Sequence, residues 1–296
     1  MKILSKSFIL FSIVTLGFSA CSNEEAQPNT SDSDNVIRLS SSIGLETRAG
    51  SNLLVNHFAN GTSISVQVTD KAQTNPVSYS LATYTDDGSG NMTTNPVQYY
   101  PAGGGKVDIY AYYPSNAASA FEVATDQSGD DNYKTSDLMY ASLSNVTKNS
   151  NDHVLQFSHK LSKISVTLVK GNGVTDADLS QATIQLKDVI VKGTFTHSSG
   201  QFEAAPDENA NKGTITIATS AGQTQRSAIV VPQSVTGKQL SVSIGGTEAI
   251  YTMPETTFAA GSHYTYSITV SRTGISVTSS ITNWTSTDAV NGSAGF

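Results

Sequence analysis

Apolar and polar residues alternate along several short stretches of the chain, and this alternation predicts β-strands. The clearest examples are SISVQV at 63–68, KISVTLV at 163–169 and YTYSITV at 264–270. A period of two places every second side chain on one face of a sheet, so each stretch is typical of a half-buried strand. No stretch keeps a helical period over three turns. The pattern therefore predicts an all-β chain.

Turn-forming clusters separate these stretches. Examples are TDDGSGN at 85–91 and IGGTE at 244–248. Many short strands separated by Gly, Asn and Asp turns are typical of β-sandwiches. The polar stretch at 145–152 is the best candidate for a break between domains. We therefore predict one sandwich at 36–152 and a second at 153–296.

The first residues follow a different pattern, with an apolar run at 8–18. This run is too short to cross the ~30 Å of a bilayer's hydrocarbon as a helix, but it suits a signal peptide. Small residues precede Cys21, the only cysteine, so no intrachain disulfide can form. The alternative to a lipid-bearing cysteine is a free thiol. We predict a signal peptide at 1–20 and a lipid anchor on Cys21 in the outer membrane.

Residues 21–35 are polar and acidic and lack any apolar period, so they are predicted to be a flexible tether. The whole chain has a formal charge of −7 and only 14% charged residues. Nucleic-acid binding needs a basic face to offset the phosphate charge, so the composition argues against a nucleic-acid partner.

No stretch carries a strong catalytic or metal-binding motif. The GGGK stretch at 103–106 lacks the first glycine and the final Ser or Thr of a phosphate-binding loop. The Asp-rich and Gly-rich turns lack the alternating ligands of an EF-hand. We predict no enzyme, no cofactor and no metal site. The histidines have no metal-ligand spacing; they are His57, His153, His159, His197 and His263.

Six stretches occur in an order that resembles a known family. They are VDIYAYYP at 107–114, SDLMYA at 136–141, LQFSHKLSKISVTL at 155–168, IVVPQ at 229–233, FAAGSHYTYSITV at 258–270 and ITNW at 281–284. Together they resemble the fimbrillin family of Bacteroides-type bacteria, which includes subunits of type V pili and their tip adhesins. The resemblance implies two tandem transthyretin-like Greek-key β-sandwich domains and a lipoprotein precursor. The acidic pair after Cys21 resembles the signal for export to the outer surface.

The resemblance also implies maturation by an Arg-specific protease, and ETRAG at 46–50 matches at Arg48 and Ala49. The predicted strand at 36–48 ends there. Cleavage would detach this strand and open a groove that a foreign strand could enter by β-augmentation. The apolar residues predicted to fill that groove lie on one face of the strand; they are Ile37, Leu39, Ile43 and Leu45.

The C-terminal stretch at 274–284 is a candidate donor strand. Its segment ISVTSSI at 275–281 repeats the pattern of IRLSSSI at 37–43. Chance similarity between Ser-rich strands is one alternative, and closure of the chain's own second sandwich is another. Trp284 is then either a core residue or an anchor in a neighbouring subunit. The residues predicted to act in the donor strand are Ile275, Val277, Ile281 and Trp284.

These observations predict a structural subunit of an outer-surface pilus that polymerises by donor-strand exchange and serves in adhesion. Its expected partners are other pilus subunits, identical or accessory, and a host or microbial receptor that the sequence does not identify. The alternative is a non-polymerising surface adhesin, or a tip or glycan-binding lipoprotein. In that case a tyrosine cluster around 99–113 would be a candidate ligand surface. The sequence leaves open whether the subunit belongs to the shaft or the tip.

Overall fold

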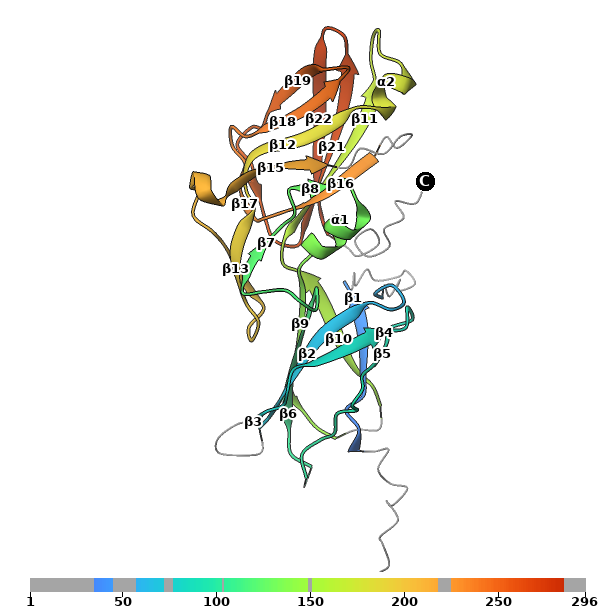
Figure 1. Cartoon of the computed structure of the whole chain (residues 1–296), viewed down its shortest axis with the longest axis vertical. Coiled ribbons are helices and arrows are strands. Elements are labelled where there is room, and N and C mark those ends of the chain that lie inside the picture. Colours follow the sequence, from blue (N-terminus) through green and yellow to red (C-terminus); the bar gives the residue numbers. More distant parts are fainter. Residues whose placement is uncertain are drawn as a thin grey trace, which may run out of the picture.

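The computed structural model describes residues 35–44, 57–71, 77–102, 104–148, 151–217 and 225–284. This part of the chain is all-β, with two short helices and one 3-10 turn. The molecule is elongated, with the strands β1 to β6 at one end, the strands β18, β19, β21 and β22 at the other, and β7 and β13 between them (Figure 1). The all-β class predicted from the alternation is confirmed.

The first sheet has eight strands and closes on itself, because β2 pairs with β6 as well as with β4. A closed sheet leaves few free edges for a foreign strand. The strands in spatial order are β3 (Val77–Ser78), β2 (Ser63–Asp70), β4 (Ala82–Asp86), β5 (Asn91–Thr93), β1 (Leu39–Ile43), β10 (His153–His159), β9 (Met139–Val146) and β6 (Val107–Tyr113).

Two larger sheets form the other end of the molecule. One contains β19 (Thr247–Thr252), β18 (Gln239–Ile244), β12 (Thr183–Ile190), β15 (Lys212–Ile217) and β8 (Asp126–Gln127). The other contains β16 (Gln225–Val230), β11 (Ser162–Lys170), β21 (Ser262–Ser271) and β22 (Gly274–Asn283). Because β19 lies against β22 and β15 against β16, these two sheets are in contact.

The remaining elements are small. A three-stranded sheet contains β14 (Gln201–Ala204), β13 (Lys192–Thr196) and β7 (Ala120–Glu122), and β17 (Gln233–Ser234) pairs with β20 (Thr257–Phe258). The helices are α1 (Asp130–Ser136), α2 (Asp176–Ser180) and the 3-10 helix η2 (Asn209–Asn211). A capping box at Thr175 begins α2, since its hydroxyl accepts a hydrogen bond from the Asp178 backbone N–H.

The predicted alternation corresponds to burial in the core. On β21 the side chains of Tyr264, Tyr266, Ile268 and Val270 are buried, while those between them are only partly covered. On β2 the apolar positions are buried as predicted, but Ser65 is buried as well, because its hydroxyl donates to the Ser115 carbonyl. A satisfied polar group can occupy such a position without a large desolvation cost.

Strand pairing crosses the boundary that the sequence analysis places at residue 152. The strand β10 begins at His153, yet it pairs with β1 and β9 in the first sheet. In the opposite sense, β7 and β8 precede that boundary but pair with β13 and β15. The polar stretch at 145–152 therefore connects two antiparallel strands of one sheet. The division of the chain into two domains stays a prediction.

Candidate functional site

The strand β1 is an inner strand of the first sheet, between β5 and β10. It runs parallel to β10, from Leu39 opposite His153 to Ile43 opposite Phe157. It runs antiparallel to β5, where Leu39 lies opposite Met92. Its removal would expose the backbone hydrogen-bonding groups of both neighbours, which is the requirement for a site that accepts a strand.

Three of the four side chains predicted to fill the groove lie in the core. Ile37 and Leu39 are each 2% exposed and Ile43 is 0% exposed, whereas Arg38 between them is exposed. Burial of each large apolar side chain contributes roughly 1.5–3 kcal/mol to stability. A strand that places apolar side chains at these positions is therefore bound favourably. The fourth predicted residue, Leu45, lies outside the described residues.

Ser41 anchors β1 through three hydrogen bonds. Its backbone N–H donates to the Gly90 carbonyl over 2.8 Å, and its own carbonyl oxygen lies 2.7 Å from His57 Nδ1. Its hydroxyl donates to Asp86 Oδ2 over 2.5 Å. The Asp86 side chain is fully buried, so this hydrogen bond satisfies a group that has no access to water.

On β10, the residue opposite Leu39 is His153, which contacts a neutral partner. His153 Nε2 lies 2.7 Å from the Tyr100 hydroxyl. Burial lowers the pKa of His153, with Asp152 acting in the opposite direction. A lowered pKa favours the neutral imidazole near neutral pH. The position on β10 opposite Leu39 therefore favours an uncharged side chain.

The candidate donor strand β22 folds back against β21 as an antiparallel hairpin. It is the edge strand of its sheet, and within the described part of the chain it pairs by hydrogen bonds with β21 alone. Its apolar positions share a face with the buried face of β21, since Ile281 pairs with Tyr264 and Val277 with Ile268. Ile281 is nevertheless 63% exposed. The strand thus presents apolar side chains that its own sheet only partly covers.

Trp284 directly follows β22 and makes a buried contact between distant elements. Its ring stacks on that of His159, with ring centroids 3.6 Å apart and planes inclined by 5°. His159 closes β10, and its Nδ1 lies 2.8 Å from Asp137 Oδ1 just after α1. The Trp284 backbone N–H donates to the Gly261 carbonyl over 2.9 Å. In the single chain Trp284 is therefore a packed residue that holds the end of β22.

The structure places three of the four arginines. Arg226 lies within β16, where it is 2% exposed and its guanidinium donates to the carbonyls of Ala182 and Leu179. Arg38 is exposed immediately before β1, and Arg272 is exposed in the turn between β21 and β22. The predicted processing residues Arg48 and Ala49 and the predicted lipidation residue Cys21 lie outside the described residues.

The histidines contact different elements and do not form a cluster. Within the described ranges no group of three or more His, Cys, Asp or Glu residues has the arrangement of a metal site. Over the same ranges, no helix combines the length and the apolar character needed to cross a membrane. Of the tyrosines considered as a ligand surface, Tyr100 and Tyr112 are buried, whereas Tyr99 is 48% exposed.

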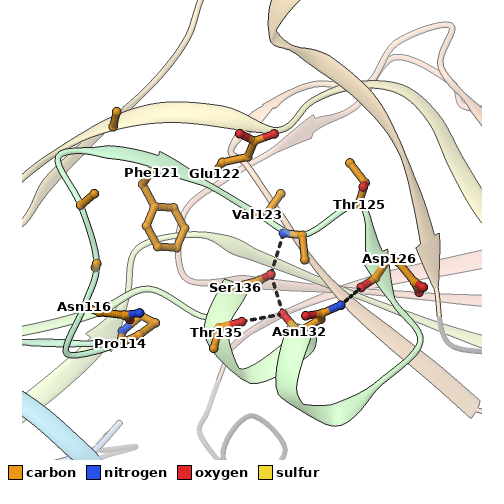
Figure 2. Close-up of a pocket in the computed structure, with 14 residues that line it drawn as sticks. Pro114, Asn116, Phe121, Glu122, Val123, Thr125, Asp126, Asn132, Thr135 and Ser136 are labelled. Carbon is orange, nitrogen blue, oxygen red and sulfur yellow. Dashed lines mark hydrogen bonds between the residues drawn. The ribbon is translucent and has the colours of Figure 1, made fainter.

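A pocket of about 520 Å³ lies between α1 and the segment that contains β7. Figure 2 shows its polar groups bonded to one another: the Ala124 N–H donates to Ser136 Oγ, and Ser136 Oγ donates to the Asn132 carbonyl. Hydrogen bonds from Ser128 hold the pKa of Asp126 below its usual value. A general base works best with a pKa near the working pH, so this carboxyl is poorly suited to that role.

The sequence patterns do not identify two buried carboxylates: Asp86, which accepts a hydrogen bond from Ser41 of β1, and Asp137, which contacts His159 at the end of β10. Asp86 lies in a stretch treated only as a turn, and Asp137 lies in a stretch quoted only for its resemblance. The signal for Asp86 is weak, because an Asp two residues before a Gly is typical of any exposed turn. Its burial depends on contact with β1, which is 45 residues away along the chain.

Comparisons with known proteins identify relatives of this chain. The sequence pattern of the fimbrillin-like family matches residues 47–284. A protein of Bacteroides uniformis assigned as fimbrium subunit Fim1C is 26% identical over 92% of this chain and 93% of its own length. The matched family is a fimbrial structural family and not an enzyme family.

Two solved structures share the fold. A protein of Bacteroides uniformis assigned to cell adhesion superposes with a TM-score of 0.67 at 24% identity, covering 87% of this chain and 100% of that chain. A second, from Bacteroides ovatus, gives a TM-score of 0.68 at 21% identity, covering 86% of this chain and 99% of that chain. The motifs, the fold and the match to the family pattern agree: the chain belongs to the fimbrillin-like family.

Proposed function

We propose that this protein is a structural subunit of an outer-surface pilus that polymerises by donor-strand exchange and serves in adhesion. One observation carries the proposal. An inner, buried strand, β1, lies directly before the predicted cleavage site, and its pattern recurs in an exposed edge strand, β22. Cleavage after Arg48 would allow β1 to leave, and β22 of another subunit would fill the same position.

The rest of the maturation pathway belongs to the same proposal. Signal peptidase removes residues 1–20, and lipid on Cys21 anchors the precursor in the outer membrane. The family implies a cell-surface or pilus location, which agrees with this anchor. Several acyl chains, at ~0.8 kcal/mol per buried methylene, would hold the precursor stably until the protease releases it. Two transthyretin-like Greek-key domains are the proposed architecture of the mature subunit.

A non-polymerising surface adhesin is the second candidate, and a specific observation favours it. In the single chain β22 pairs with β21 over its whole length, and Trp284 is buried against His159. A subunit that keeps this contact permanently would have no free donor strand. The two candidates differ in whether β22 leaves its own sheet after maturation.

Treatment of the precursor with an Arg-specific protease tests the proposal. The precursor used in this experiment starts at residue 22, so that it carries no lipid anchor. Intact mass locates the cut, and an unheated denaturing gel detects polymers. We expect one cut after Arg48 followed by a ladder of polymers. The variant Arg48→Ala should stay intact and monomeric, and deletion of residues 274–296 should permit the cut but abolish the ladder. Clean cutting of the full chain without a ladder would favour the non-polymerising adhesin.

A further inference from the structure

We infer that Asp86 selects the incoming strand by requiring a hydroxyl group at one position, and that Ser279 supplies it. The inference rests on the proposed strand exchange and identifies the chemistry of the strand that the groove accepts. It assigns Asp86 and Ser279 as a specificity-determining pair across the subunit interface.

The first step is the state of Asp86 in the precursor. Its side chain is 0% exposed. Oδ1 accepts a hydrogen bond from the Gly88 backbone N–H over 2.8 Å, and Oδ2 accepts one from the Ser41 hydroxyl over 2.5 Å. The first donor belongs to the same turn and stays when β1 leaves. The second donor leaves with β1, so one buried oxygen loses its partner.

A replacement strand buries Asp86 again. The side chain that this strand places at the Ser41 position therefore decides whether Oδ2 has a hydrogen-bond donor. An apolar side chain at the Ser41 position would enclose Oδ2 without a donor. A buried polar atom without a partner is costly, and more so when the atom belongs to an ionisable group. The groove should therefore reject strands with Ala, Val or Ile at this position, although the positions of Leu39 and Ile43, two residues to either side, favour large apolar residues.

The pattern of β22 provides the hydroxyl in register. Aligning Ile275 with Ile37 places Val277 at Leu39 and Ile281 at Ile43. The same alignment places Ser279 at Ser41. A strand that occupies the position of β1 in this register would run parallel to β10, as β1 does. One alignment thus satisfies the three apolar positions and the Ser41 position together.

Within its own subunit the Ser279 side chain is not part of the core. It is exposed on the edge strand, opposite Tyr266 of β21. A substitution there should leave the folded monomer unchanged, so an effect on the polymer would report on the groove of the neighbouring subunit. Ser276 offers a matched control. It is also an exposed Ser on β22, and the alignment places it at Arg38, which is exposed.

The experiment compares polymers of protease-treated full chains that carry Ser279→Ala or Ser276→Ala. The measurement is the half-life of the ladder in a fixed concentration of mild denaturant. Loss of a hydrogen bond to a buried ionisable group predicts a half-life that is roughly tenfold to a hundredfold shorter for Ser279→Ala. Ser276→Ala should stay within about twofold of the wild type, because surface substitutions have small effects.

A double-mutant cycle with Asp86→Asn tests whether the two residues act through each other. Asn offers a neutral side chain, so the Ser279→Ala penalty should shrink several-fold in this background. An unchanged half-life for Ser279→Ala, or an equal penalty in both backgrounds, would overturn the inference while the wild-type ladder still supports strand exchange. A wild-type chain that is cut but forms no ladder would overturn the proposed function, and the inference with it.

Discussion

At the scale of single residues, the position of β1 depends on polar groups as much as on apolar burial. Ser41 engages Asp86, His57 and the Gly90 carbonyl at once. The sequence predicts the apolar face that contains Ile37, because alternation alone determines it. It cannot predict the Asp86 contact, because that contact depends on which distant turn packs against β1.

Gly90 gives the sharpest test of this local network. Its φ of +90° disfavours a side chain, and a Cβ there would lie 2.2 Å from His57 Nδ1 and 2.8 Å from the Ser41 carbonyl oxygen. Gly104 also has a positive φ, of +75°, but no atom lies within 4 Å of the Cβ position. We expect Gly90→Ala to lower the free energy of unfolding by about 2–4 kcal/mol and Gly104→Ala by about 1 kcal/mol, measured by chemical denaturation. Equal costs would show that the contact with β1 is unimportant.

At the scale of elements, the alternation predicts strands well but their partners poorly. The predicted strand face of β22 is present, yet the strand lies at an edge where Ile281 is 63% exposed. Likewise no local pattern places β10 beside β1, since the two strands are more than a hundred residues apart. Local periodicity determines which face of a strand is apolar. Sheet order depends on long-range packing that no local pattern records.

Substitution of Ile281 should affect the stability of the polymer much more than the stability of the monomer. In the single chain it is largely exposed, so Ile281→Ala should change the free energy of unfolding of the monomer by less than about 0.5 kcal/mol. In the polymer it would replace Ile43, which is 0% exposed, and its loss should cost about 2–5 kcal/mol per interface. Thermal denaturation of the uncut chain and of the isolated ladder measures the two values. A similar effect on both would contradict the proposed role of β22.

At the scale of the whole molecule, the parts needed for assembly lie in different sheets. The proposed acceptor position is in the closed first sheet, and the proposed donor is an edge strand of the opposite end (Figure 1). Since β1 and β22 belong to different sheets, one subunit can donate and accept a strand at the same time. This arrangement is suited to a linear, head-to-tail assembly.

The buried tyrosines predict how the stability of the whole molecule depends on pH. Burial raises the pKa of Tyr84 and of Tyr113 to about 12. Because the unfolded value is near 10, the folded state disfavours ionisation, so stability is fully present below pH ~10 and is lost as the pH rises toward 12. For Tyr84, which is 2% exposed, the loss should approach ~1.4 kcal/mol per pH unit above 10. Denaturation curves between pH 8 and 11 measure the slope, and Tyr84→Phe should reduce it. A slope unchanged by that substitution would show that Tyr84 does not cause the pH dependence of stability.

The most direct test of the account asks whether β22 of one subunit occupies the position of β1 in another. In the precursor Ser40 lies opposite Val154 on β10, and the alignment places Thr278 at Ser40. In the single chain Thr278 lies opposite Ser267 in a different sheet. Chains that carry Thr278→Cys and Val154→Cys, without Cys21, would be oxidised before and after Arg-specific cleavage and resolved on a non-reducing denaturing gel after heating.

Strand exchange predicts heat-stable, reducible polymers only after cleavage, because disulfide formation requires Cα atoms within about 7 Å. Moving the donor cysteine by two residues, in a Ser276→Cys and Val154→Cys chain, should sharply reduce the crosslink. A crosslink that forms equally well in the uncut chain, or a cut chain that polymerises without this crosslink, would contradict the proposed exchange of β1 for β22.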